Sequence, residues 1–466
     1  MQKNNSDFIG VMPIPKLLLK FSVPAIISTT VNCLYNIVDR LYLANSIGSD
    51  AQAGLSLTFP VMIVLMAFGM LVGQGSGAAV SLLLGENRKQ DADKVLGQAI
   101  ALFLIFVVSF QALGLIFLDE LLVFLGGTPQ AIPYARSYLS IILWGSIFQH
   151  MSFGLSNVVR SEGSSKKAMS IIILGATCNI ILDPIFIFVF KMGIAGAALA
   201  TVLSMLISSS WVLLHFILGK GTLQLHLKYI RIYPRLCLRV FSIGLAPCLM
   251  QIVHSAVVFA FNHSFKLHAA DDAYATLAIG AYGIVNSILM CLLMPAFGIM
   301  QGAQPIIGYN YGAKLYDRVK KASTLSLKLA FSISVGISIL TFICARYLAL
   351  CFSRETELVD LITSVLRIYA VGFSFISLGM LTGNYFQSTG KAARALFLSL
   401  TRQIIFLLPV LLILPHFCGF TGIWWAQPVS DFLSGSLAMI FYYHELKFLK
   451  KNALAIEGKN QPFLVA

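Results

Sequence analysis

Two aspartates, an amide and a hydroxyl that lie within apolar segments are the side chains of this chain best suited to chemistry. Asn179 and Asp183 are one helical turn apart, and Thr201 follows on the next segment. Counted from the short loop that joins these two segments, Asp183 and Thr201 lie about seven and about eight residues deep, which at a rise of 1.5 Å per residue is a common depth. Asp39 lies in the matching half of an earlier segment. Oxygen ligands of this kind suit Na⁺, or a proton that two carboxylates share.

Burying a charge in lipid costs several kcal/mol, so acids inside apolar segments indicate function by default. Asp39 ends a polar stripe whose spacing of i, i+4, i+8 and i+11 puts four side chains on one helix face: Ser28, Asn32, Asn36 and Asp39. Pairing with Arg40 is the structural alternative for Asp39, and helix cementing by hydrogen bonds is the alternative for Asn179 and Thr201. The role of Asp431, which follows Pro428 in the last apolar segment, is left open. Its side chain either faces a cleft in the second half of the molecule or bonds to a backbone group that the proline frees.

A set of polar and thioether side chains on the same segments predicts contacts with a transported molecule. Met62, Met66 and Met70 form an i, i+4, i+8 stripe, and flexible thioethers suit ligands of varied shape, although ordinary packing gives the same pattern. The predicted contact residues are Asn32, Tyr35, Asn36, Met62, Met66, Gln149 and Asn157.

The composition predicts an all-α polytopic membrane protein. Hydrophobic residues are 58% of the chain and charged residues 11%, against roughly a quarter charged in soluble domains. The apolar residues fall in blocks long enough to cross a hydrocarbon core of about 30 Å. Twelve spans are predicted, near residues 16–40, 52–82, 95–118, 134–159, 167–190, 193–218, 238–265, 275–307, 322–345, 358–387, 395–415 and 421–445.

The second half of the chain repeats landmarks of the first half. Gln74-Gly75 returns as Gln301-Gly302 at an offset of 227, and Pro24 returns as Pro247 at 223. We therefore expect two pseudo-symmetric lobes of six helices, residues 1–225 and 226–466, which is an architecture of secondary transporters. Proline frees a backbone carbonyl and bends a helix, so its recurrence favours hinges at Pro24 and Pro247.

The positions of the 33 Lys and Arg residues predict the orientation. Assigned to alternate connections, 24 of them fall on one side, six on the other and three inside spans. The positive-inside rule then places both termini in the cytoplasm. The net charge of +14 is spread over every cytoplasmic connection, so it does not indicate nucleic-acid binding.

Several function classes lack their motifs here. The sequence has no phosphate-binding loop and no His/Cys cluster with metal-ligand spacing. We therefore expect no cofactor and no bound metal other than possible Na⁺. We also expect an ion gradient to supply the energy for transport. No span carries a nucleophile and base motif for an enzyme, and a channel would more naturally be an oligomer with a ring of like residues. We expect a monomer in contact with lipids and small molecules.

The ordered motifs resemble the multidrug and toxic compound extrusion (MATE) family over nearly the whole chain. The resemblance rests on Pro24 with Asn36-Ile37-Val38-Asp39, on Gly73-Gln74-Gly75, on the segments 179–184 and 193–201, and on Gln301-Gly302-Ala303-Gln304-Pro305. It implies an antiporter that exports cationic or amphiphilic compounds across the cytoplasmic (inner) membrane against H⁺ or Na⁺. In the family branch with its cation site in the N-terminal lobe, the ligands fall on Asp39, Asn179, Asp183 and Thr201. The other branch carries acids in the seventh and tenth spans; here the seventh span has none, and the tenth has only Asp360, at its third residue.

A flippase for a lipid-linked precursor is the alternative function. Such a protein is expected to line its cleft with several Arg or Lys for phosphate groups. Only Lys328, Arg367 and Arg402 are candidates within the spans.

The predicted topology can be tested by labelling. Single cysteines introduced near Ser49 and Gly419 should react with an impermeant maleimide added to intact cells, because the few cations of those connections place them outside. Cysteines near Gly85 and Tyr316 should react only after the cells are opened. Labelling of the latter pair in intact cells would reverse the orientation.

Overall fold

The computed structural model describes residues 7–46 and 49–460, with the side chains of 36–37, 40–41, 43–46, 49–51, 53 and 456–460 outside the description. The described residues form helices and connecting loops. The helices of the first half are α1 (Phe8–Val11), α2 (Ile14–Ser46), α3 (Ser49–Gly85), α4 (Lys89–Ile116), α5 (Leu118–Phe124), α6 (Ile132–Ser161), α7 (Ser165–Pro184), the π-helix η1 (Ile185–Val189) and α8 (Gly193–Ile217). After the 3₁₀ turn η2 (Leu227–Tyr229), the second half contains α9 (Pro234–His268), α10 (Asp272–Leu292), α11 (Met294–Gly312), α12 (Tyr316–Leu350), α13 (Thr356–Ser388), α14 (Ala392–Leu400), the π-helix η3 (Thr401–Leu407), α15 (Leu408–Cys418) and α16 (Phe420–Asn460).

All twelve predicted spans fall on helices. Within the described part of the chain, ten helical segments are long and apolar enough to cross a membrane, and α6 and α16 have the length with a less apolar sequence. The eighth span was predicted as one continuous helix, and the structure breaks it into α10 and α11. Pro295 is the second residue of α11 and has no N–H to donate to the carbonyl one turn earlier, which explains the break at this point.

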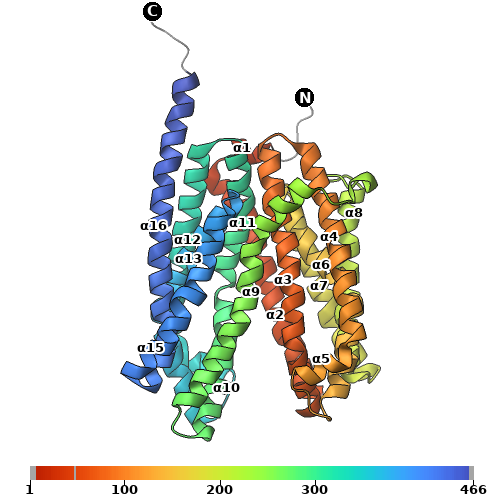
Figure 1. Cartoon of the computed structure of the whole chain (residues 1–466), viewed down its shortest axis with the longest axis vertical. Helices are drawn as coiled ribbons and strands as arrows, with labels where there is room; N and C mark the ends of the chain where they lie inside the picture. Colours follow the sequence, from red (N-terminus) through yellow and green to blue (C-terminus); the bar gives the residue numbers. More distant parts are fainter. Residues whose placement is uncertain (1–6, 47–48, 461–466) are drawn as a thin grey trace, which may run out of the picture.

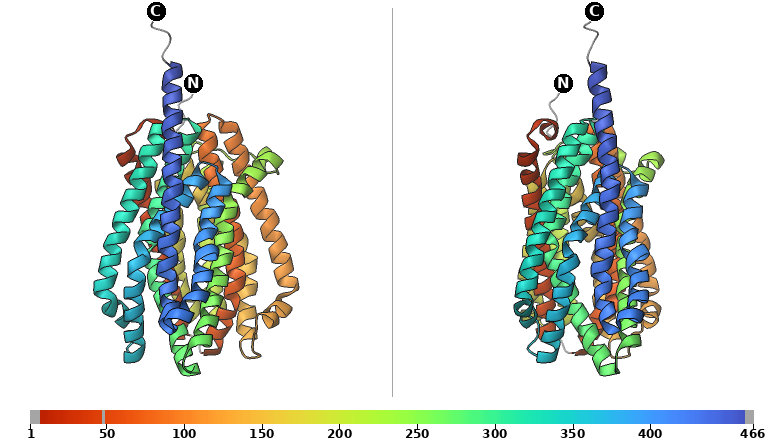
Figure 2. Two further views of the ribbon diagram at one scale, coloured as in Figure 1. Left: turned by 60° about the vertical axis from the view of Figure 1, so that its left-hand side comes forward. Right: turned by 90° about the vertical axis from the view of Figure 1, so that its left-hand side faces the viewer.

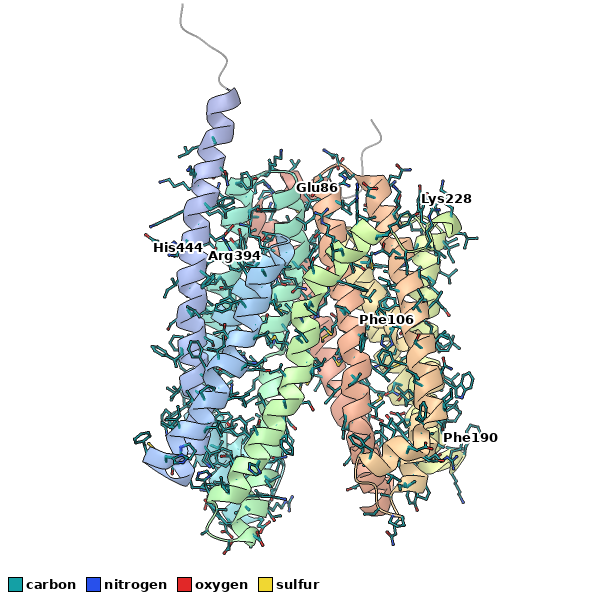
Figure 3. All side chains as sticks on the ribbon, in the orientation of Figure 1. Glu86, Phe106, Phe190, Lys228, Arg394 and His444 are labelled. Carbon is teal, nitrogen blue, oxygen red and sulfur yellow. The ribbon has the colours of Figure 1, made fainter. Side chains whose placement is uncertain are left out.

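The helices form two bundles that meet at one end of the molecule (Figure 1). Helices α2–α8 make one bundle and α9–α16 the other, and α16 extends past its neighbours in every view (Figure 2). Glu86 and Lys228 lie at the end where α1 lies, and Phe190 lies at the opposite end (Figure 3). We call the end that holds α1, Glu86 and Lys228 the basic end. Toward the opposite end the two bundles diverge.

The loop between the bundles stays attached to the N-terminal one. It holds the boundary predicted at residue 225, and on either side of that point the backbone N–H of Gln224 donates to Asp93 Oδ1 and that of Tyr233 to Gln98 Oε1. Tyr229 between them is buried. The C-terminal bundle therefore begins at Pro234, the first residue of α9.

The apolar core is shared between the lobes only in part. One cluster of buried side chains joins both lobes and includes Phe21 and Val72 from the first lobe with Val240 and Ile306 from the second. Other clusters lie within the second lobe alone or within the first lobe alone. Apolar burial therefore joins the lobes in one region and leaves each lobe with a core of its own elsewhere.

Glycines let the two lobes touch backbone to backbone. A Cβ on Gly244 of α9 would lie 1.9 Å from the Leu71 carbonyl oxygen of α3, and one on Gly75 would lie 2.3 Å from that of Val240. The repeated glycine, Gly302 of α11, faces Ser22 of α2 with only 2.6 Å for a Cβ. We call this row the glycine seam, with two further members nearer the basic end, Gly85 against Tyr309 and Gly312 against Leu82. Small residues at helix crossings permit such approach.

Polar contacts fasten the same end. Arg239 of α9 pairs with Glu86 after α3 at 2.9 Å, which joins the two lobes. Arg318 of α12 donates from Nη2 to the carbonyls of Ile9 (3.0 Å) and Met12 (2.6 Å), so α1 of the first half is held by the second.

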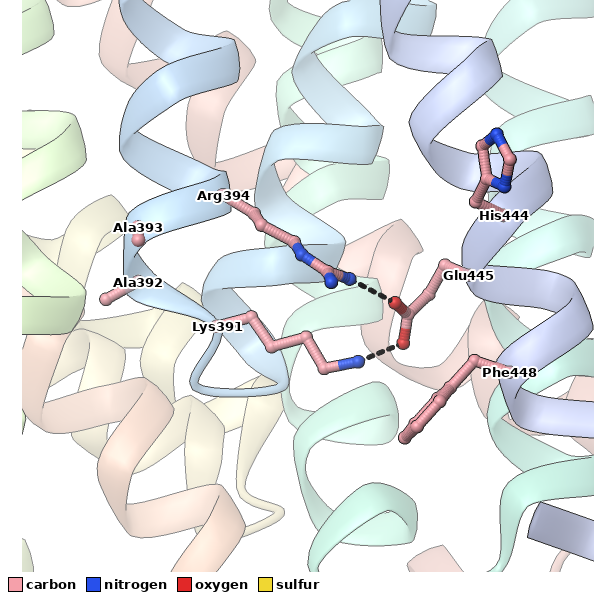
Figure 4. Close-up of a pocket in the computed structure, with 7 residues that line it drawn as sticks. All are labelled: Lys391, Ala392, Ala393, Arg394, His444, Glu445 and Phe448. Atoms are coloured by element: carbon pink, nitrogen blue, oxygen red, sulfur yellow. Dashed lines mark hydrogen bonds and ion pairs between the residues drawn. The ribbon is translucent and has the colours of Figure 1, made fainter.

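Two buried glutamates brace the basic end inside the lobes. Glu162 accepts from the Leu223 N–H at 2.9 Å and faces His215 Nε2 at 2.5 Å, which ties the connecting loop to the N-terminal lobe. Glu445 of α16 contacts Lys391 and Arg394 from the loop and helix that follow α13 (Figure 4). Each carboxylate is 1% exposed, and its burial is tolerated because charged or N–H partners surround it.

The glycine seam gives a steric prediction. Gly244→Val should disfavour closure at the basic end, since the added carbon atoms overlap the Leu71 carbonyl. Overpacking costs about 1–3 kcal/mol, which is roughly a 5- to 160-fold loss of the closed state. The readout is the maleimide reaction rate of the native Cys248 thiol, which is buried beside Leu71, in a chain whose other cysteines are serine. Gly336→Val is the matched control because a Cβ there meets nothing within 4 Å. An unchanged rate for Gly244→Val would contradict the seam.

A cysteine pair reports on the same arrangement. Cys33 of α2 and Cys291 of α10 come from different lobes, and their sulfur atoms lie 2.6 Å apart. Oxidation by copper phenanthroline should join them and stop transport, because the cross-link holds the lobes in one arrangement, and dithiothreitol should restore it. Peptide mass analysis checks the link. If oxidation stopped transport equally in Cys33→Ser protein, the link would not be the cause.

Candidate functional site

The predicted amide, carboxylate and hydroxyl meet inside the N-terminal lobe. Asn179 Nδ2 donates to Asp183 Oδ1 at 3.2 Å, along one face of α7, and to Thr201 Oγ1 of α8 at 3.3 Å. Asn179 is 2% exposed and Asp183 is fully buried. The one-turn spacing on α7 aligns the first two groups, and the neighbouring helix α8 supplies the third.

Asp39 of α2 completes the group. It lies close enough to Asp183 for the two carboxyl groups to share a hydrogen bond. Two carboxylates are both acceptors, so this bond exists only when one of them holds a proton. The three helices α2, α7 and α8 therefore bring together the four side chains predicted from their depth.

The orientation of the oxygen atoms fits a small cation. Asp183 Oδ2 and Asn179 Oδ1 are buried, and no described side chain or N–H donates to either atom. Acceptors of this kind are satisfied by a proton or by a hard cation such as Na⁺, which takes oxygen ligands. These oxygen atoms thus fit a proton or a monovalent cation.

The backbone next to Asp183 departs from an α-helix. Pro184 ends α7, and the five residues of η1 continue the span as a π-helix, with the Phe190 N–H bonded to the Ile185 carbonyl. Proline removes a hydrogen bond from the helix, and single π-helical turns occur frequently at functional sites.

Tyr138 of α6 belongs to this group and was not predicted. It is 8% exposed and lies near the carboxyl groups of Asp39 and Asp183 and the phenol of Tyr35. Its span carries no acid that would have drawn attention to it. Only the packing of α6 against α8 reveals the position.

The predicted substrate contacts are spread over the first lobe. Met66 is 38% exposed and its sulfur receives a hydrogen bond from Gln251 of the other lobe at 3.6 Å. Met62 packs within apolar clusters of the first lobe. Asn157 is buried and bonded locally, to the Phe153 carbonyl and to Arg160. Asn32, Tyr35 and Gln149 are partly buried. The side chain of Asn36 lies outside the described part of the structure.

The two predicted hinge prolines occupy matching places. Pro24 lies inside α2 and Pro247 inside α9, and each helix continues past its proline. Thr29 of α2, five residues after Pro24, donates to the Met294 carbonyl at the start of α11 at 3.2 Å. The part of α2 that follows Pro24 thus touches the broken span of the other lobe.

Asp431, whose role the sequence left open, has a basic partner. Arg402 of η3 donates from Nη1 to Asp431 Oδ1 at 3.3 Å, and Gln427 Nε2 donates to both carboxylate oxygens at 3.0 and 3.2 Å. Asp431 is 2% exposed. The ion pair joins residues that are 29 apart on different helices, so no local motif indicates it.

Comparisons with known proteins agree with this architecture. The MatE family model matches residues 24–185 and 273–413. The chain is 26% identical over 446 residues to the multidrug export protein MepA of Staphylococcus aureus (strain MSSA476), covering 92% of this chain and 94% of that protein. MepA of Staphylococcus haemolyticus (strain JCSC1435) is 26% identical over 431 residues, covering 92% and 93%.

Solved structures share the fold. An outward-facing conformation of a multidrug resistance MATE family transporter of the MOP superfamily gives a TM-score of 0.91 at 23% identity, covering 97% of this chain and 100% of that chain. A MATE in the straight conformation and one in the bent conformation give 0.90 and 0.89, both at 24% identity and covering the same shares. Because the family model matches well over half of the chain and the twelve spans form its two-lobe fold, the chain belongs to the MATE (MatE) family of membrane transporters.

Proposed function

We propose that the protein is a cation-coupled multidrug antiporter, which exports cationic or amphiphilic compounds in exchange for H⁺ or Na⁺. The observation that carries this proposal is the acid pair of the partly buried Asp39 and the fully buried Asp183, with Asn179 and Thr201 beside it. The basic end would face the cytoplasm, as the positive-inside rule requires, in a monomer of the cytoplasmic membrane.

The acid pair supplies the exchange by electrostatics. In a water-poor pocket two neighbouring carboxylates cannot both stay charged unless a proton or cation lies between them. A cationic cargo molecule near the pair relieves the same repulsion. The coupling ion and a cationic cargo molecule then compete to neutralise the same acid pair, so release of one favours binding of the other.

The arrangement of the lobes supports one step of the cycle. The glycine seam closes the basic end while the bundles diverge at the other, which is the geometry of an outward-facing transporter. Rocking of the lobes about Pro24 and Pro247 would open the basic end. The straight and bent conformations reported for similar structures are consistent with a hinge within the fold.

Two observations support the cargo class. The relatives in Staphylococcus are named multidrug export proteins. In this chain, Met66 and Gln251 meet across the lobes, and a thioether beside an amide offers an adaptable surface. We propose that this surface contacts cargo, together with Asn32, Tyr35, Asn36, Met62, Gln149 and Asn157 as further candidates.

The flippase alternative lacks its expected basic lining. Arg402 is paired with Asp431, and Arg367 lies over the Phe342 ring, whose side chain is 51% exposed on the bundle surface. Lys328 lines a groove between α12 and the start of α2, beside Pro15. None of the three is placed to bind the phosphates of a lipid-linked precursor between the lobes, which favours the antiporter.

Neutralising the acid pair tests the proposal. In vesicles with an imposed Na⁺ or pH gradient, Asp183→Asn should keep its fold and lose gradient-driven dye transport by tenfold or more, since the amide keeps the size of the side chain but not its charge. Asp39→Asn should do the same, and the double variant should be little worse than either, because the two act as one site.

Two controls bound this result. Asp360→Asn removes an exposed carboxylate paired with Arg346 and should transport normally. Asp431→Asn should retain measurable gradient-driven transport, because it lies in the other lobe. Normal gradient dependence in well-folded Asp183→Asn protein would refute the mechanism.

A further inference from the structure

A basic groove lies at the basic end, where α12 of the second lobe meets the start of α2 of the first. Its volume is about 660 Å³. The two helices are in contact and lie side by side at the edge of the molecule (Figure 2). The described lining residues include one acid, Asp317, and four cations, which are Arg318, Lys320, Lys321 and Lys328. We call this site the α12 groove.

The cations of the α12 groove are not neutralised within the protein. None of the four forms an ion pair with an acid of the described part of the chain. Arg318 donates to Asn310 Oδ1 at 2.9 Å and to two backbone carbonyls, which are neutral acceptors. The three lysines are exposed. Their charges repel one another, so an anion in the groove relieves this repulsion.

The corresponding helix of the first lobe carries no such excess of charge. α4 begins at Lys89 and α12 at Tyr316, an offset of 227 that the repeated Gln-Gly motif shares. Residues 86–101 hold three acids and three Lys or Arg, whereas the matching residues 313–328 hold one acid and five Lys or Arg. The basic character is therefore specific to α12.

Three replacements account for most of the difference. Arg318, Lys320 and Lys328 stand where the first lobe has Asp91, Asp93 and Ala101. In the first lobe Asp91 pairs with Arg88 at 2.8 Å and with Lys94 at 2.9 Å. The second lobe has lost these acids and gained cations, so its positive charge needs a partner from outside the chain.

Lys328 lies deeper than the other cations of the groove. It is six residues inside the span predicted at 322–345, or about 9 Å along the helix at 1.5 Å per residue. Side chains of a helix tilt toward its N-terminus, and α12 begins at the basic end, so a lysine here extends back toward that surface. A cation at this depth is costly in lipid unless its head reaches water or an anion near the headgroups.

Beyond Lys328 the exposed face of α12 is apolar. Leu329, Ile333, Leu340 and Ile343 follow at i, i+4, i+11 and i+14, and each is 36–67% exposed. Only 17% of the apolar window of α12 is buried, the lowest share among the ten candidate spans of the described chain. A site for a negative group thus continues into a surface for acyl chains, which matches a phospholipid rather than a soluble anion.

We propose that the α12 groove binds the headgroup of one anionic phospholipid from the membrane leaflet at the basic end. Its phosphate lies among the lysines, and its acyl chains follow the apolar face of α12. The positive-inside rule places this end in the cytoplasm, where the leaflet carries anionic lipids. The proposal uses no residue of the acid pair, so it does not depend on the exchange proposed above.

Equilibrium binding of phosphatidylglycerol tests the groove. The full chain, purified in a neutral detergent, is titrated with dioleoyl phosphatidylglycerol, and native mass spectrometry counts the lipids bound per chain. The native chain should hold one phosphatidylglycerol more tightly than phosphatidylcholine. Lys321→Gln/Lys328→Ala should bind it roughly 25-fold more weakly, because each lysine near a membrane surface contributes roughly fivefold. Lys328→Arg, which keeps the charge, should bind it normally.

A matched variant separates the groove from general attraction. Lys447→Gln/Lys450→Gln removes the same charge from exposed positions of α16 at the basic end and should keep the tightly bound lipid. An equal loss in both double variants would overturn the proposal. Displacement of phosphatidylglycerol by an equal concentration of inorganic phosphate would also overturn it, because the groove would then be a site for a soluble anion.

A further measurement uses the native chain alone. Phosphatidylglycerol with a diazirine in its acyl chain, in nanodiscs of phosphatidylcholine, should label the α12 peptide that contains Leu329 and Ile333. The matching phosphatidylcholine probe should label this peptide roughly fivefold less or more weakly still, since its headgroup has no net charge for even one lysine to attract. Equal labelling by the two probes would overturn the proposal even if every groove variant misfolded.

Discussion

The burial of carboxylates in a water-poor helical bundle is the constraint on which this structure depends. An ionised acid away from water needs a positive partner or a set of N–H donors, or it must take up a proton. Among the side chains that the structure describes, four acids are at most 2% exposed: Glu162, Asp183, Asp431 and Glu445. Three of them have fixed partners within the chain, and those three hold helices or loops together. Asp183 instead faces Asp39 and the Asn179 amide, and the exchange proposed above depends on compensation of this acid pair by a proton or a cation.

Much of the architecture can be predicted because the membrane simplifies the physics. Lipid admits only apolar helices, so twelve apolar blocks predict twelve spans, and the distribution of Lys and Arg predicts how they alternate. The meeting of Asn179 with Asp183 follows from helical spacing alone, and the contact with Thr201 follows from equal depth on consecutive helices. Helical spacing and depth in the membrane are local properties, so they can be read from a single sequence.

Contacts between distant helices escape that reasoning. The pairing of Arg402 with Asp431, the approach of Tyr138 to the acid pair and the bond of Glu162 to Leu223 depend on how helices rotate and cross. The break before Met294 and the π-helical turns also depend on tertiary partners, because proline in a membrane helix is compatible with a bend, a break or neither.

The glycine seam has a consequence for the entropy of the conformational cycle. Interfaces built from long side chains lose rotamer freedom each time they form, which amounts to as much as about 1.5–2 kcal/mol for each flexible side chain. Where Gly75, Gly244 and Gly302 meet backbone atoms of the other lobe, the glycine side of the contact has no rotamers to order. Opening and closing at these points therefore exchange van der Waals contact with little conformational entropy. An interface of this kind adds little to the free-energy difference between the closed and the open state. A small difference of this kind lets a protein populate both conformations.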